Sequence, residues 1–227
     1  MKIAIIPARG GSKRIPRKNI KLFHGKPMIA YSIEAAQASG CFDKIIVSTD
    51  DQEIAQVACE YGAEVPFMRP ADISDDHATT LDVLQHAVGW CDEHIGQIDY
   101  VCCIYATAPF IQSHDLLSGL KLVQEPNVEY AFSATSFPFP IQRAIKLSKA
   151  GEVEMFEPQN ALVRSQDLEE AYHDAGQFYW GKKRALEQGL AFFAPHSRAV
   201  LLPRKRVQDI DTPEDWELAE ALFSIMW

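Results

Sequence analysis

Short β-branched runs alternate along this chain with longer stretches of helical periodicity, and this alternation limits the folds that are open to it. The runs predict strands at Lys2–Pro7, Lys44–Thr49, Glu64–Phe67, Tyr100–Tyr105 and Tyr130–Thr135. The stretches between them predict helices at Met28–Ser39, Asp51–Tyr61, Thr79–Glu93 and Ser113–Gln124. Strands that alternate with helices in this way form βαβ units. We therefore expect an α/β fold with a Rossmann-like, mostly parallel sheet flanked by helices.

Residues at the helix ends support these assignments. Asp50 and Ser113 are side chains of the kind that cap a helix N-terminus. Near the C-terminus, residues 212–215 (Thr-Pro-Glu-Asp) place a cap, a first-turn proline and two acidic residues ahead of Trp216–Phe223. This order of residues predicts a final helix.

The alternation loosens between Phe137 and Ala161, where three prolines and a glycine interrupt it. Two short extended runs predict a hairpin that leaves the sheet, at Ile141–Leu147 and Glu152–Phe156. The chain is expected to rejoin the sheet at Gln177–Trp180. About 25 residues cannot build a core of their own. We therefore expect a single domain over residues 1–227 with a small excursion at about 137–161.

The charge is unevenly distributed along the chain. Residues 1–33 hold eight of the 22 Lys and Arg residues and no Asp or Glu. The remainder holds 14 basic and 31 acidic residues. A basic island on an acidic protein favours a small anionic ligand over a nucleic acid, which the acidic surface would repel.

Membrane spans and disulfides are not expected. No apolar run approaches the roughly 18–20 residues of a membrane span, and Ile3–Ile6 is too short for the core of a signal peptide. The five cysteines form no CxxC pair and no cluster with histidine. This usage predicts reduced thiols in a cytoplasmic protein.

The basic island follows the first strand directly, as Pro-Ala-Arg-Gly-Gly-Ser-Lys-Arg-Ile-Pro-Arg-Lys-Asn at residues 7–19. Ligands bind at the carboxyl ends of strands in open α/β sheets. Gly10 and Gly11 allow backbone N–H groups close to an anion, and Ser12 adds a hydroxyl donor. The loop also supplies five cations that can neutralise a triphosphate, namely Arg9, Lys13, Arg14, Arg17 and Lys18. It is neither a Walker loop nor a GxGxxG loop; the alternative interpretation is a solvated basic loop.

This loop, continued by Gly25-Lys26-Pro27-Met28-Ile29, closely resembles the acylneuraminate cytidylyltransferase (CMP-sialic acid synthetase) family. The resemblance extends along nearly the whole chain and implies the nucleotide-diphospho-sugar transferase type of fold. It implies that Arg9, Ser12 and Lys18 contact the phosphates of CTP and that Asn19 supports the nucleotide. The expected nucleotide-binding residues of the loop are Ala8, Arg9, Gly10, Gly11, Ser12, Lys18 and Asn19.

A second segment, from Arg69 to Thr80, resembles the part of the family that reads the base. Cytosine presents a donor beside two acceptors, so a reader must offer both carbonyls and donors. The resemblance assigns this role to the Ala78 backbone and the Thr80 hydroxyl, with Arg69 in the same nucleotide site. The alternative is a helix start capped by Asp76 or Thr79.

Two departures from the sialic-acid enzymes concern the sugar. Tyr105 occupies the position at which those enzymes have a glutamine that contacts the sugar. Ala175-Gly176 occupies the position at which they commonly have Asn-Gly. The string Tyr-His-Asp-Ala-Gly-Gln-Phe-Tyr-Trp at residues 172–180 is similar to the pseudaminic acid cytidylyltransferase branch. The expected sugar-binding residues are Tyr105, Arg143, Arg164, Gln166, His173, Gln177 and Tyr179, with Arg164 placed to pair with the sugar carboxylate. Tyr179 and Trp180 are equally compatible with a core strand.

Asp209 and Asp211 are the candidate metal ligands. Residues i and i+2 of an extended segment point the same way, so the two carboxylates share one face. Hard oxygen ligands beside a triphosphate suit Mg²⁺, and the pair matches the metal pair of the family. The alternative is that Asp211 only caps the last helix.

The sequence therefore predicts a cytidylyltransferase. The anomeric hydroxyl of a nine-carbon acid sugar, with pseudaminic acid favoured, attacks the α-phosphorus of CTP and pyrophosphate leaves. The expected catalytic residues are Arg9, Lys18, Asp209 and Asp211, with Mg²⁺ as cofactor. The resemblance also implies a homodimer in which the excursion reaches the neighbour. Enzymes for N-acetylneuraminate or a ketodeoxyoctonate-type acid remain alternatives, as does a non-catalytic module for nucleotide-sugar sensing or RNA binding.

Overall fold

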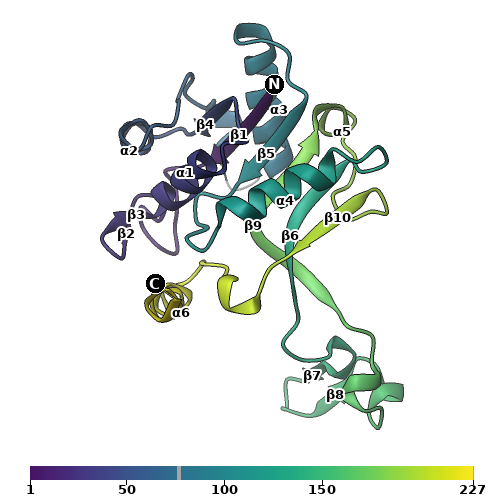
Figure 1. Cartoon of the computed structure of the whole chain (residues 1–227). Coiled ribbons are helices and arrows are strands. Elements are labelled where there is room, and N and C mark those ends of the chain that lie inside the picture. The colour runs from purple at the N-terminus through teal and green to yellow at the C-terminus, as the bar shows by residue number, and fades with distance from the viewer. Residues whose placement is uncertain (76–77, 227) are drawn as a thin grey trace.

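The computed structural model describes residues 1–75 and 78–226, and its centre is a six-stranded mixed sheet (Figure 1). The strand order is β10-β6-β9-β5-β1-β4. The strands are β1 (Lys2–Pro7), β4 (Lys44–Ser48), β5 (Tyr100–Ile104), β6 (Tyr130–Ser136), β9 (Tyr172–Lys182) and β10 (Ser197–Leu201). Only β9 runs antiparallel to its neighbours β5 and β6; the other pairs are parallel. The predicted α/β class with a mostly parallel sheet is confirmed.

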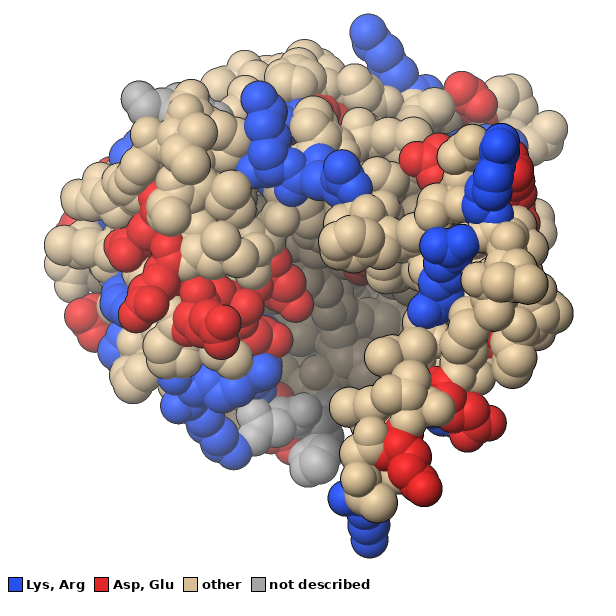
Figure 2. All heavy atoms as spheres, turned by 90° about the horizontal axis from the view of Figure 1, so that it is seen from below, with Lys and Arg blue, Asp and Glu red and all other residues tan. Residues whose placement is uncertain are grey.

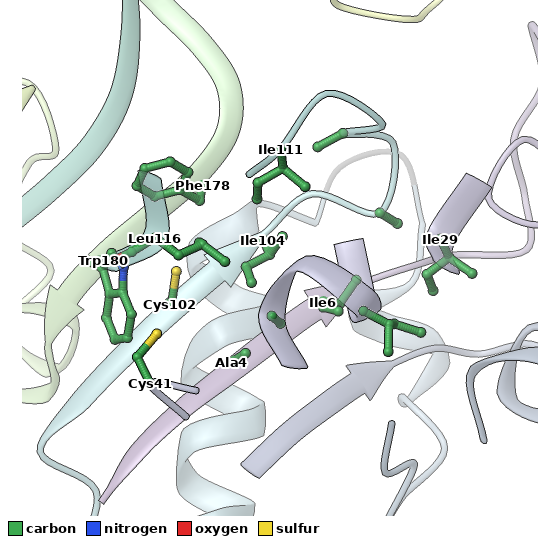
Figure 3. Packing of buried hydrophobic residues seen from close by; sticks show 14 of the residues in the cluster. Ala4, Ile6, Ile29, Cys41, Cys102, Ile104, Ile111, Leu116, Phe178 and Trp180 are labelled. Carbon is green, nitrogen blue, oxygen red and sulfur yellow. Dashed lines mark hydrogen bonds between the residues drawn. The ribbon is translucent and has the colours of Figure 1, made fainter. Parts of the chain in front are cut away.

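Helices cover both faces of the sheet because the strands are apolar on both faces. Ala4 and Ile6 pack in one cluster with residues of α1 (Met28–Ser39), α2 (Gln52–Glu60) and α4 (Ser113–Val123). Ile3 and Ile5 alternate with them and pack in a second cluster with α3 (Thr80–His94) and α5 (Lys183–Glu187). Figure 3 shows the first cluster, in which side chains of the strands, such as Ile6 of β1, meet side chains of the helices, such as Leu116 of α4.

A third apolar cluster holds the basic loop against the end of the chain. Ile15 of the loop packs with Phe23 of the small hairpin β2 (Leu22–Phe23) and β3 (Lys26–Pro27), and with Trp216 of α6 (Pro213–Met226). The same cluster includes Ile210, which lies between the two candidate metal ligands. Burial of these groups therefore ties the first and last segments of the chain together.

An arm projects from the sheet between β6 and β9 (Figure 1). It contains the antiparallel pair β7 (Ile145–Leu147) and β8 (Val153–Met155). The predicted hairpin excursion is therefore present, but it runs through residues 137–171 rather than ending at 161, because β9 begins only at Tyr172.

Three local predictions were wrong. The expected strand at Glu64–Phe67 is reduced to two isolated bridges, Ile46 with Glu64 and Thr49 with Met68, because Pro66 has no N–H for a ladder. The cap of α2 is Asp51 rather than Asp50. Ser113 is the first residue of α4, with Gln112 in the cap position and no side-chain cap bond.

Other helix starts follow the sequence. Thr79 caps α3 in a capping box with Asp82, and the other proposed cap, Asp76, lies outside the described residues. At α6, Thr212 Oγ1 accepts from the N–H of Asp215, whose carboxylate accepts from Thr212 N in return. Within the described ranges, no helix is long and apolar enough to cross a membrane.

Candidate active site

The site begins where β1, β4 and β5 end on one edge of the sheet. The loop after β1 continues the pairing with β4, since Ala8 N–H donates to Ser48 O at 3.0 Å. Asn19 is buried and its Nδ2 donates to Arg9 O at 2.9 Å, which ties the two ends of the loop together. The loop is thus fixed by backbone and side-chain bonds before any ligand binds.

A cavity of about 570 Å³ opens above this loop. Its walls come from the loop, from residues within 69–75 and 78–83, and from the segment after β5. The lining includes nine of the predicted site residues. They are Arg9, Ser12, Lys18, Asn19, Arg69, Ala78, Thr80, Tyr105 and Asp211. Ala8, Gly10 and Gly11 belong to the loop but do not line the cavity.

The cavity carries an excess of positive charge. Its described lining holds five cations, which are Arg9, Lys13, Arg14, Lys18 and Arg69, against the carboxylates of Asp75 and Asp211. Arg69 is buried, and burial lowers its pKa although Asp50 opposes the shift. A guanidinium kept out of water in this way binds an anion strongly. The cavity is therefore built for a polyanion.

Two residues of the loop do not lie as the sequence suggested. Arg17, counted among the phosphate-neutralising cations, has a left-handed backbone (φ 56°) that turns it to the start of α2. There it donates to both carboxylate oxygens of Asp51, at 2.5 and 2.9 Å, and also pairs with Glu53. The second residue is Gly10, whose N–H was predicted to approach an anionic ligand but instead donates to Asp50 Oδ1 at 2.9 Å. Arg17 therefore shapes the loop and does not line the cavity.

A second cavity of about 490 Å³ adjoins the first, and Tyr105 lines both. Three predicted sugar-binding residues meet here, namely Tyr105, His173 and Tyr179, beside Asp174 and Asp209. The rings of Tyr105 and Tyr179 lie 5.4 Å apart, and burial raises the pKa of both hydroxyls. Tyr179 donates to Asp174, a wall residue that the sequence argument passed over although it stands between the residues quoted for the sugar.

The other predicted sugar-binding residues lie outside both cavities of this chain. Gln177 is buried beneath them and its Nε2 donates to Arg206 O at 2.5 Å. Arg143, Arg164 and Gln166 lie on the arm. There Arg143 donates to Val163 O and Arg164 pairs with Asp167 at 3.0 Å. Seen from below, the surface is hollowed between the body and the arm (Figure 2).

The two candidate metal ligands lie at the junction of the cavities. Asp211 lines the first cavity and accepts from Lys18 Nζ at 3.2 Å and Arg14 Nη2 at 2.8 Å. Asp209 lines the second, and within the described residues no hydrogen bond reaches its carboxylate. Loss of water around the group and the like charge of Asp211 raise the pKa of Asp209. A cation between the two carboxylates would relieve that repulsion, so the donor set fits Mg²⁺.

Phosphate oxygens would have to complete such a metal site. In the part of the chain that the structure describes, no group of three or more His, Cys, Asp or Glu side chains could hold a metal ion. Mg²⁺ is commonly held by one or two carboxylates together with substrate phosphates. The pair Asp209 and Asp211, placed beside a cationic cavity, meets this description.

Comparison with known proteins agrees with this geometry. A cytidylyltransferase family profile matches residues 3–222. The chain is 47% identical to a pseudaminic acid cytidylyltransferase of Campylobacter jejuni, over 98% of this chain and 96% of that one. It is 30% identical to the CMP-N,N'-diacetyllegionaminic acid synthase of Legionella pneumophila, with the same coverage of both.

Among solved structures, the fold resembles a CMP:2-keto-3-deoxy-manno-octonic acid synthetase complexed with CTP, with a TM-score of 0.70 and 20% identity. That match covers 100% of this chain and 99% of the other. At this identity the likeness concerns the fold alone. The extent of the family match, with the identity to full-length relatives, settles the classification: this chain belongs to the cytidylyltransferase family.

Proposed function

We propose that this protein transfers CMP from CTP to a nonulosonic acid and that pseudaminic acid is its preferred acceptor. The observation that carries the proposal is the pair of adjoining cavities that meet at Tyr105, one of them rich in cations. CTP fits the cationic cavity and the acid sugar fits the second. The 47% identity to the Campylobacter jejuni enzyme supports the choice of sugar.

The chemistry follows from positioning and charge neutralisation. The anomeric hydroxyl attacks the α-phosphorus, a new P–O bond forms, and the bond to pyrophosphate breaks. Arg9 and Lys18 lie in the cationic cavity, where they stabilise the negative charge that develops on the phosphates. Asp209 and Asp211 would hold Mg²⁺, which supplies further compensation of that charge when bound.

Base selection rests on the start of α3. Ala78 and Thr80 line the cationic cavity beside Arg69. The Ala78 N–H already donates to Asp75 Oδ1 at 2.9 Å. We therefore assign the Ala78 carbonyl and the Thr80 hydroxyl to the recognition of cytosine, which requires both an acceptor and donors.

Sugar selection rests on Tyr105. Its ring lies against Tyr179 and it lines both cavities, so it stands between them. A glutamine at this position would leave a wall of a different shape and different hydrogen-bonding groups. We therefore expect pseudaminic acid to exceed N-acetylneuraminate by at least about tenfold in kcat/KM, which needs only about 1.4 kcal/mol of differential transition-state binding.

Pyrophosphate release with a panel of substrates tests the proposal. The panel combines CTP, UTP, ATP and GTP with pseudaminic acid, N-acetylneuraminate and a ketodeoxyoctonate. We expect release with CTP and pseudaminic acid, a reduced preference in Tyr105→Gln, and a retained preference in Tyr105→Phe, which keeps the ring. A preference for N-acetylneuraminate would remove the sugar assignment only, whereas no release with any sugar would remove the transferase.

The arm supports a further part of the proposal, that the protein is a homodimer. Phe139 and Leu162 of the arm are 79% and 97% exposed, beside exposed Leu147 and Phe156. A two-stranded hairpin is marginally stable alone, and large apolar side chains exposed on such an arm favour contact with a partner. In the dimer, the arm would bring Arg143 to the partner's sugar site. Sedimentation should give the mass of two chains, and Phe139→Ser with Leu162→Ser should weaken association; a monomeric wild type would contradict the proposal.

A cytoplasmic location belongs to the same proposal. All five cysteines are free thiols in the structure. Reduced thiols are typical of proteins in the cytosol, where disulfides are rare.

A further inference from the structure

The segment that carries Asp209 and Asp211 crosses from β10 to α6 over residues 202–212. Its first residue is bonded to the sheet, since Leu202 N–H donates to Ala134 O at 2.8 Å. Near its end, Ile210 is fully buried and its carbonyl accepts from Lys18 Nζ at 2.5 Å. Between these anchors the segment needs another attachment if the two carboxylates are to keep fixed positions.

Arg206 provides that attachment. Its guanidinium donates to both carboxylate oxygens of Asp115, in the first turn of α4, at 2.6 and 3.2 Å. The two side chains are only 12% and 6% exposed. The carbonyl of Arg206 accepts from Gln177 Nε2 of β9 at 2.5 Å. One residue is thus held by a helix through its side chain and by the sheet through its backbone.

The two candidate metal ligands depend on this attachment to different degrees. Asp211 is held directly by Arg14 and Lys18 of the basic loop. Asp209 lies three residues beyond Arg206, and its carboxylate accepts no hydrogen bond within the described part of the chain. The position of Asp209 is therefore set by the backbone. Gln208 Nε2 donates to the Asp209 carbonyl at 3.0 Å, and Arg206 fixes the backbone that leads to both residues.

We propose that the Asp115–Arg206 ion pair positions Asp209 for metal binding. The inference rests on the proposed function, because it takes Asp209 to be a metal ligand. Neither residue lines either cavity of the site, so both act through the backbone. Two parallel hydrogen bonds suit this task, since together they fix both the direction and the distance of the Arg206 guanidinium from the Asp115 carboxylate.

A purely structural role is the competing explanation. Breaking a buried ion pair lowers stability whatever the pair positions, so loss of melting temperature cannot distinguish the two. The decisive quantity is the affinity for the metal. Groups that orient metal ligands typically change that affinity ten- to a hundredfold when they are replaced.

The experiment measures Mn²⁺ binding in the protein–CTP complex by electron paramagnetic resonance, which separates it from Mn²⁺ on free CTP. Arg206→Lys keeps the charge but removes the fork, and Asp115→Asn keeps the shape but removes the charge. Asp209→Asn serves as the reference. Arg184→Lys is the control for the loss of a two-bonded arginine, because Arg184 donates twice to Glu129 and lines neither cavity of the site, although its side chain is more exposed, at 60%.

We expect Mn²⁺ to bind roughly ten- to a hundredfold more weakly in Arg206→Lys and Asp115→Asn, and normally in Arg184→Lys. The Mg²⁺ concentration for half-maximal rate should rise in parallel while KM for CTP changes less. If Asp115→Asn does not fold, Arg206→Lys decides by the same measurement.

Two results overturn the proposal in distinguishable ways. If Mn²⁺ affinity falls only in Asp209→Asn, the positioning role is wrong and the metal assignment stands. If Asp209→Asn also binds Mn²⁺ normally, the metal assignment in the proposed function fails and the positioning role fails with it.

Discussion

Replacing Gly10 by alanine should destabilise the protein, because the new methyl group meets a side chain that cannot move away. A Cβ at Gly10 lies 2.6 Å from Asp51 Oδ2 and 3.0 Å from Asp51 Cβ. That carboxylate accepts two hydrogen bonds from Arg17 and two from the backbone N–H groups of Glu53 and Ile54. It is the N-cap of α2, so displacing it disturbs both the loop and the helix.

The size of the effect follows from these contacts. Overpacking costs about 1–3 kcal/mol, and a weakened N-cap about 1 kcal/mol. We expect a loss of about 2 kcal/mol in the free energy of unfolding. In a chain of this length each kcal/mol lowers Tm by roughly 2–4 °C, so Gly10→Ala should melt roughly 4–8 °C below the wild type.

The neighbouring glycine is the matched control. A Cβ at Gly11 has no atom within 4 Å, so Gly11→Ala should stay within about 0.5 kcal/mol of the wild type. In an Asp51→Ala background, Gly10→Ala should cost less than alone, because the carboxylate contact at 2.6 Å is gone while the Cβ contact at 3.0 Å remains. Thermal melting of the four variants checks this. Equal melting of Gly10→Ala and Gly11→Ala would refute the packing argument.

Three further predictions concern the ligand sites and pH. Asp209→Asn and Asp211→Asn should each lower kcat roughly a hundredfold or more and raise the Mg²⁺ requirement, with Tm nearly unchanged; near-normal turnover would remove the metal from these residues. CTP should raise Tm more than UTP, ATP or GTP, and equal protection by all four would mean that only the phosphates are bound. Arg17 holds the pKa of Asp51 at about 2, below its usual 3.8, so the carboxylate stabilises the fold above 3.8 and this contribution is lost as the pH falls through about 2. The stability gap between wild type and Arg17→Gln, from urea unfolding, should therefore be constant at neutral pH and narrow as the pH falls from 3.8 toward 2; a widening gap would contradict this.

Much of the fold was predictable because local pattern and tertiary structure agree. β1 and α1 have the predicted bounds, since β-branched residues end at Pro7 and apolar helical spacing begins at Met28. The sequence-based assignments were wrong where the local structure depends on residues that are distant in the sequence. Asp50 and Asp51 are equally good caps in sequence, but Asp50 accepts from the Gly10 N–H, which leaves the cap position to Asp51.

The site was predictable only in part, for the same reason. Motifs identified the loop and the Tyr105 wall, since those residues are close in sequence to strand ends. The partners of Arg17 are 34 and 36 residues away, and those of Arg206 are 91 and 29 residues away. Pairs at such separations carry no local signal, so sequence reasoning counted Arg17 as a phosphate ligand and missed Arg206 altogether.

The choice of sugar can be measured by competition in one reaction mixture. The enzyme receives CTP, Mg²⁺ and equal amounts of pseudaminic acid and N-acetylneuraminate, and mass spectrometry follows the two CMP-sugars at low conversion. Their ratio gives the ratio of kcat/KM directly. We expect CMP-pseudaminic acid to form at least about tenfold faster, whereas equal rates or an excess of CMP-N-acetylneuraminate would exclude a preference for pseudaminic acid.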